Sequence, residues 1–80
     1  MSGLLIVGAA GAQEPTRASI PCHIAANGAG PAGQEVAVAF AGDAAELLRP
    51  DVIAAVRGVG LPPLRDLVDK CIAQNVRFYV

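Results

Sequence analysis

The chain has 80 residues, of which 54% are apolar and 16% charged, and its formal net charge is −1. This composition excludes an extended disordered tail and predicts one compact domain spanning residues 1–80. The six basic residues are scattered singly, so no basic patch is available to bind nucleic acid. A domain of this size hides only about 60% of the surface its unfolded chain exposes, so we expect a homo-oligomer.

The first apolar run extends from Gly3 to Ala12. A secretory signal is one interpretation, but no basic residue precedes the run, and it is shorter than the roughly 20 residues of a membrane span. A first core strand over Leu4–Val7 explains the run better, and we expect no membrane association.

Two further apolar runs, Glu35–Phe40 and Val76–Val80, are also expected to be strands. Strands that are apolar on both faces are typical of parallel sheets covered by helices. We therefore expect a parallel sheet with the first strand in the middle, and the right-handed crossover rule then places helices on both faces.

The first helix is expected to begin at a capping Thr16 or Ser19 and to continue through Asn27. Pro21 would kink a helix that starts at Thr16, but it is harmless in the first turn of one that starts at Ser19. After the second strand, a short helical turn is expected over residues 44–48.

A second short helix is expected over Val52–Arg57, and the clearest helix follows Pro63. Asp66 and Lys70 of this last helix are expected to pair on its solvated face. Its apolar residues recur at helical spacing and predict one buried stripe: Leu64, Leu67, Val68, Cys71 and Ile72.

The segment NGAGPAG contains Gly28, Gly30 and Gly33 at the G-x-G-x-x-G spacing of dinucleotide-binding enzymes. In those enzymes the glycines follow a strand and open a helix. Here they follow a predicted helix and precede a predicted strand. They are therefore expected to form a helix exit, and no cofactor is predicted.

Ligands of open α/β sheets bind beyond the carboxyl ends of the strands. This edge should include Gly11 after the first strand, Gly42 and Asp43 after the second, and whatever follows Val80. Asp43 either caps the short helix that follows it or shapes the edge. The open edge of the third strand should be covered by further chain or by a neighbouring subunit.

His23 and Asn27 are four residues apart and therefore share a helix face. Either they satisfy hydrogen bonds at a packing or subunit interface, or they face the carboxyl edge and orient an anionic or sulfur ligand. One histidine and two cysteines, Cys22 and Cys71, are too few for a zinc site or a disulfide framework. We predict no metal, and a reducing cytoplasm fits best.

Four segments, HIAANGA, GDAAELL, GVGLPPL and VRFYV, resemble the DsrE/DsrF-like family of small sulfur-relay proteins in their order and spacing. The resemblance covers Leu4 to Val80. It implies a flavodoxin-like fold, assembly into dimers, trimers or hexamers, and sulfur donor and acceptor proteins as partners.

The resemblance also implies a persulfide-carrying cysteine immediately after the third strand. The sequence ends at Val80, one residue before that position. The fold is therefore expected to be truncated after the third strand and incomplete at the C-terminus, or the reactive site has been lost. Neither Cys22 nor Cys71 matches the family position.

The predicted environments of the two cysteines agree with this mismatch. Cys71 lies on the apolar stripe near a helix C-terminus, where the helix dipole disfavours a thiolate, and is expected in the core. Whether Cys22 is reactive stays open, because nothing beside it requires a lowered pKa.

Three functions are consistent with the sequence. The first is a sulfur-relay or persulfide-handling protein of the DsrE/DsrF-like type, acting as a small homo-oligomer. The second is a non-catalytic oligomeric small-ligand-binding or regulatory module with the same fold. The third, a flavin- or nucleotide-binding oxidoreductase, would be yellow or would gain thermal stability with a nucleotide.

Overall fold

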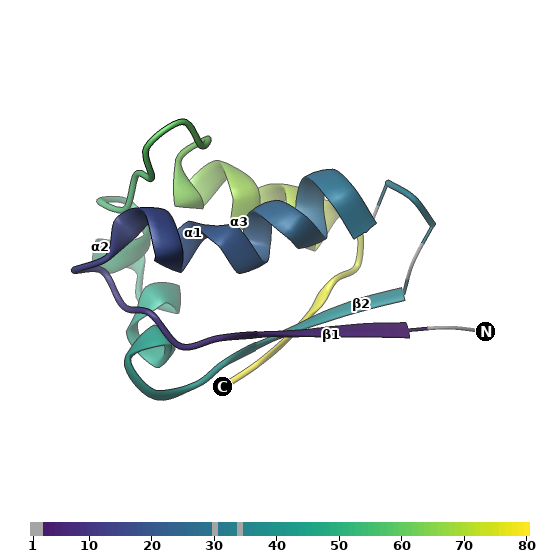
Figure 1. The fold of residues 1–80 in the computed structure, drawn as a ribbon, viewed down its shortest axis with the longest axis horizontal. Coiled ribbons are helices and arrows are strands. Elements are labelled where there is room, and N and C mark those ends of the chain that lie inside the picture. The colour runs from purple at the N-terminus through teal and green to yellow at the C-terminus, as the bar shows by residue number, and fades with distance from the viewer. Residues whose placement is uncertain (1–2, 30, 34) are drawn as a thin grey trace.

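The computed structural model describes residues 3–29, 31–33 and 35–80 (Figure 1). A three-stranded sheet lies beneath two long helices, and shorter helical segments lie at one end of the sheet. The elements in chain order are β1 Gly3–Gly8, α1 Pro15–Ile24, the π-helical turn η1 Ala25–Ala29, β2 Glu35–Phe40, the 3-10 helix η2 Gly42–Leu48, α2 Pro50–Ile53, α3 Leu64–Ala73 and β3 Arg77–Tyr79.

The sheet is parallel throughout, with Leu4 opposite Val36 and Ala37 opposite Arg77. This confirms the expected α/β arrangement, in which helices connect parallel strands. The strand order is β1-β2-β3, so the prediction that the first strand lies in the middle is wrong. Each helical connection leads to the next strand in the same direction across the sheet, and the second connection does not return past β1.

The strand order also determines where the helices lie. Crossovers of one hand that advance in the same direction place their helices on the same face of a sheet. In agreement, α1 and α3 pack against each other above the strands (Figure 1). This differs from the expected placement of helices on both faces.

The core lies between the sheet and these two helices. Val36, Val38 and Phe40 alternate along β2 and are buried on the helix side. Phe78 of β3 lies opposite Val38 and packs edge to face on Phe40, with ring centroids 5.5 Å apart. This alternation directs the large side chains of the central strand toward the helices.

The other face of the sheet is open in the part of the chain that the structure describes. Leu5 and Val7 of β1 remain 59% and 61% exposed, and Tyr79 of β3 remains 51% exposed. The register aligns Val7, Ala39 and Tyr79 across the three strands. We call Leu5, Val7, Ala37, Ala39 and Tyr79 the open face. The sheet therefore buries its two faces very unequally.

Helix α1 starts at Pro15 and contains Pro21, as in the earlier of the two predicted starts. Neither predicted cap forms. The Ser19 hydroxyl donates to the Pro15 carbonyl at 2.8 Å, and the Thr16 hydroxyl accepts the Val59 amide at 2.9 Å. The Ser19 hydroxyl is used within the helix and the Thr16 hydroxyl joins the helix to the loop before α3, so neither caps the helix.

The glycine-rich segment has the predicted backbone role. Gly28 lies in η1, at the end of the first helical segment, and Gly33 has a left-handed φ of +85° just before β2. Gly30 lies outside the described residues. Gly28 and Gly33 therefore belong to a helix exit, and they do not open a helix as a dinucleotide site requires.

The later helices differ from expectation in three details. Helix α2 begins at Pro50 and ends at Ile53, so it starts and stops earlier than the predicted Val52–Arg57. In α3 the predicted stripe is buried except for Ile72, which is 60% exposed. The Asp66–Lys70 pair does not form, since Lys70 donates to Asn27 of η1 instead.

No helix in the described part of the chain has both the length and the apolar character needed to cross a membrane.

Candidate functional site

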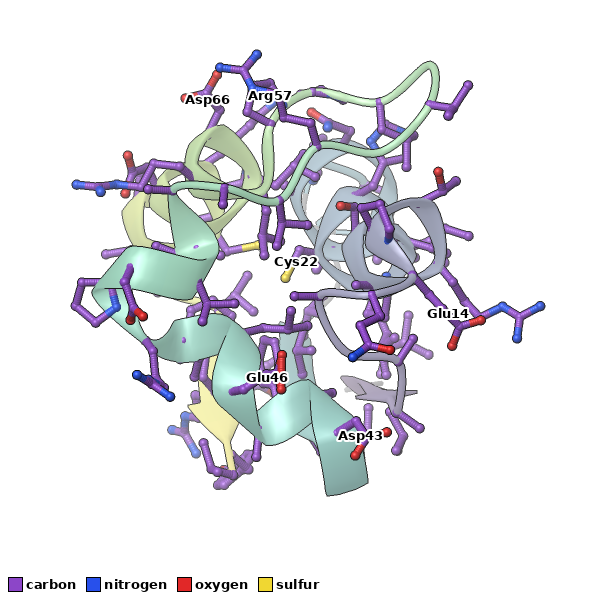
Figure 2. The ribbon with its side chains drawn as sticks, turned by 90° about the vertical axis from the view of Figure 1, so that its left-hand side faces the viewer. Glu14, Cys22, Asp43, Glu46, Arg57 and Asp66 are labelled. Atoms are coloured by element: carbon purple, nitrogen blue, oxygen red, sulfur yellow. The ribbon has the colours of Figure 1, made fainter. Side chains whose placement is uncertain are left out.

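A hollow of about 340 Å³ lies where the carboxyl ends of β1 and β2 meet. Figure 2 looks onto this end of the sheet, with Asp43 and Glu46 projecting from η2 and Glu14 lying at the start of α1. We call this hollow the rim pocket. Its lining residues are Gly11, Ala12, Gln13, Glu14, Asp43 and Glu46.

Gly11 and Asp43, two of the predicted site residues, are in direct contact at the rim pocket. A Cβ atom on Gly11 would lie 3.0 Å from the Asp43 carbonyl oxygen and 3.2 Å from its Cβ. The Ala41 amide also donates to the Gly8 carbonyl at 2.8 Å. The close approach of the two loops therefore depends on the missing side chain at position 11.

Gly42 turns the chain from β2 into η2. Its φ of +55° is left-handed, a conformation that glycine adopts without a steric penalty. Asp43 then lies inside the first turn of η2, and Ala41 holds the N-cap position without a side-chain hydrogen bond. Of the two interpretations of Asp43, the cap is therefore wrong, and the residue lies at the edge of the sheet.

Glu46 is a rim residue that the sequence analysis missed. Its Oε1 atom accepts the Ala12 amide at 3.3 Å and so links η2 to the loop after β1. Residues three apart eclipse each other in a 3-10 helix, which places Glu46 on the same side as Asp43. No sequence pattern indicates that Glu46 lies beside Asp43. Their alignment follows from the 3-10 geometry of residues 42–48.

The charged side chains that line the rim pocket are all acidic. Glu14, Asp43 and Glu46 contribute carboxylates, and none of the lining residues is basic. Arg17 pairs with Glu14 at 3.4 Å, but both side chains are mostly exposed, so the pair is screened by water. Such a pocket favours cations and hydrogen-bond donors, and it opposes phosphates and thiolates.

The same carboxylates do not form a metal centre. Among the described residues, no group of three or more His, Cys, Asp or Glu side chains is placed to hold a metal ion. The chemistry available at the rim pocket is therefore hydrogen bonding and charge attraction through separate carboxylates and loop backbone.

His23 and Asn27 lie away from the rim pocket. Helix α1 starts beside the carboxyl edge and runs back along the sheet (Figure 1), so its last turn and η1 lie toward the amino ends of the strands. The Asn27 side-chain amide bonds His23 Nδ1 at 3.2 Å, and its oxygen accepts from Lys70. These bonds agree with the packing interpretation, because Asn27 joins His23 of α1 to Lys70 of α3.

Cys22 and Cys71 are both fully buried between the helices, and neither lines the rim pocket. The expectation that Cys71 lies in the core is confirmed. The neighbouring Cys71 side chain, together with burial, raises the pKa of Cys22 above its ordinary value. Cys22 is therefore held as a neutral thiol, unlike a persulfide carrier, which needs an accessible thiolate.

A larger hollow of about 670 Å³ lies at the opposite end of the sheet, against the amino ends of β1 and β2 and the start of β3. Its charged lining side chains are Glu35 and Arg77, one of each sign, and both are exposed. The rim pocket is the better candidate because loops from two strands converge there with charge of one sign.

Comparison with protein-family models, with curated proteins and with solved structures finds no match for this chain.

Proposed function

We propose that this chain is a non-catalytic small-ligand-binding or regulatory module whose binding site is the rim pocket. The observation that carries the proposal is the convergence of two strand-end loops around a hollow of about 340 Å³ with carboxylates and no basic side chain in its lining. The ligand class that fits this lining is a small molecule bearing an ammonium or another cationic hydrogen-bond donor.

The buried thiols support the non-catalytic part of the proposal. The sequence contains two cysteines, and both side chains are inaccessible to a substrate in the rim pocket. The acidic lining also opposes the phosphate of a flavin or nucleotide, which makes the oxidoreductase the least favoured of the three functions.

The test is a titration of the isotopically labelled protein with 1,4-diaminobutane and, separately, with succinate, followed by amide chemical shifts. We expect the diamine to shift residues 11–14 and 42–46 and succinate to leave them unchanged. The variant Asp43→Asn should bind the diamine about fivefold more weakly, because one exposed charge contact contributes about 1 kcal/mol.

Two matched variants complete this experiment. Glu46→Gln should weaken diamine binding while keeping an oxygen that accepts the Ala12 amide. Asp69→Asn removes an exposed carboxylate on α3 that pairs with Arg65, and it should leave binding unchanged. Equal weakening by Asp43→Asn and Asp69→Asn, or stronger shifts with succinate, would contradict the proposal.

Sulfur relay of the DsrE/DsrF-like type is the second candidate. One observation favours it: β3 is parallel to β2, so a cysteine following β3 would reach the carboxyl edge beside Gly42 and Asp43. There it could take sulfur from a donor protein and pass it to an acceptor. The carboxylates of the rim pocket count against this candidate, because they disfavour the thiolate that a relay requires.

The two candidates differ in the intact mass of the native protein before and after exposure to polysulfide. The relay predicts a chain longer than these 80 residues that gains one sulfur and loses it on reduction. The binding module predicts no added sulfur. Diamine binding that survives replacement of every cysteine by serine would further favour the module.

Under either candidate we propose a homo-oligomer in the reducing cytoplasm. The open face supports the oligomer, since exposed apolar sheet surface is commonly covered by another chain. The two cysteines, both present as free thiols, support the reducing compartment.

A further inference from the structure

The two cysteines come from segments that are far apart in sequence and meet in the core. Helix α1 packs on α3 and buries small side chains, including Ala18 and Cys22, and buried Ala25 of η1 follows one turn after Cys22. Small residues on one helix allow the backbone of a second helix to approach closely. The larger residues facing them belong to α3, and Cys71 lies among them.

The contacts of the two thiols are direct. Cys71 Sγ lies 3.7 Å from the Cys22 carbonyl oxygen, so its side chain is directed at the backbone of α1. The neighbouring thiols also influence each other, since the pKa of Cys22 is raised and that of Cys71 is lowered by the other side chain. Both side chains have zero exposure, and Figure 2 shows the Cys22 sulfur in the interior between the helices.

We propose that Cys22 and Cys71 are a redox pair that a hydroperoxide converts into an intramolecular disulfide joining α1 to α3. The proposal is independent of the ligand in the rim pocket. It assigns a covalent modification to two side chains that otherwise serve as small core residues.

The reaction has two steps. The thiolate of one cysteine attacks the hydroperoxide O–O bond, which gives a sulfenic acid and, with one proton taken up, releases water or an alcohol. The second thiol attacks the sulfenic sulfur, the S–S bond forms, and the sulfenic oxygen leaves as water. In total the two thiols lose two protons and two electrons, and the hydroperoxide is reduced to one water and one further water or alcohol.

Burial determines which oxidation products can form. A sulfenic acid on either cysteine has the other thiol beside it, whereas a bulky disulfide such as oxidised glutathione cannot reach it. A small hydroperoxide can enter through local opening of the helices. We therefore expect slow, complete formation of the internal disulfide, without mixed disulfides or covalent dimers.

The cross-link would enclose the central strand and the rim. The two cysteines are 49 positions apart, and β2, η2 and α2 lie between them. The oxidised protein would therefore hold the two helices together around the segment that carries Asp43 and Glu46.

The experiment exposes the reduced protein to hydrogen peroxide, quenches it, and alkylates it with N-ethylmaleimide in denaturant. Intact mass should show two added maleimides before oxidation. After oxidation it should show none, with the loss of two hydrogens, and dithiothreitol should restore the original result. Oxidised glutathione in place of peroxide should leave both thiols free.

The variants Cys22→Ala and Cys71→Ala test the pairing. Each should stop at a sulfenic or sulfinic acid, with no disulfide. Circular dichroism of the oxidised wild type should match that of the reduced protein. The proposal is overturned by two free thiols after peroxide treatment, by a sulfinic acid in the wild type, by a disulfide-linked dimer, or by loss of helical signal on oxidation.

Discussion

Single glycines determine how the loops meet at the rim pocket. Gly42 adopts a φ of +55° with no atom near the position of a Cβ, whereas Gly11 has an ordinary φ but almost touches Asp43. Gly42 is restricted by its left-handed backbone, whereas Gly11 is restricted by the lack of room for a side chain beside Asp43. The two restrictions predict different consequences of adding a methyl group.

We predict that Gly42→Ala destabilises the protein by about 1–2 kcal/mol, because a Cβ disfavours left-handed backbone. Gly28→Ala is the matched control, since it also has open space around it but no left-handed φ. In a helical turn the alanine should leave stability unchanged or raise it by about 0.5–1 kcal/mol. Urea unfolding measures both variants, and equal losses would contradict the backbone argument.

At the scale of elements, runs of apolar residues were sufficient to predict the strands. An observed strand overlaps each of the predicted ranges Leu4–Val7, Glu35–Phe40 and 76–80, because a parallel strand is typically apolar along most of its length. The strand order could not be predicted in this way. The apolar pattern indicates which residues of a helix are buried, but it does not indicate the direction of the second crossover, which determines the strand order.

Local chemistry explains the other differences between sequence and structure. Thr16 and Ser19 have the side chains of helix caps, but the helix begins before both of them. Glu46 was not predicted because the 3-10 geometry that aligns it with Asp43 has no clear sequence pattern. The positions of Gly11, Gly42 and Asp43 at the carboxyl edge were predictable because these residues lie in the segments that follow β1 and β2.

The open face leads to a prediction about the assembly of the chain. Replacing Leu5 and Val7 together by threonine keeps strand propensity while removing apolar surface. In sedimentation at micromolar concentration, the wild type should be an oligomer and Leu5→Thr/Val7→Thr a monomer.

Val59→Thr is the control for that comparison. Val59 is 85% exposed and lies in the loop before α3, outside the sheet. Its replacement should leave the oligomer intact. A monomeric wild type, or dissociation by Val59→Thr alone, would contradict assembly through the open face.

For the whole molecule, the parallel sheet has a consequence for how the chain folds. Residue 4 pairs with residue 36, and residue 37 pairs with residue 77, so neither strand pair can be closed by a tight hairpin. Loop-closure entropy must be overcome before either pairing forms, which makes such topologies slow to fold. Strand β2 takes part in both pairings, so no part of the sheet can form before β2 is in place.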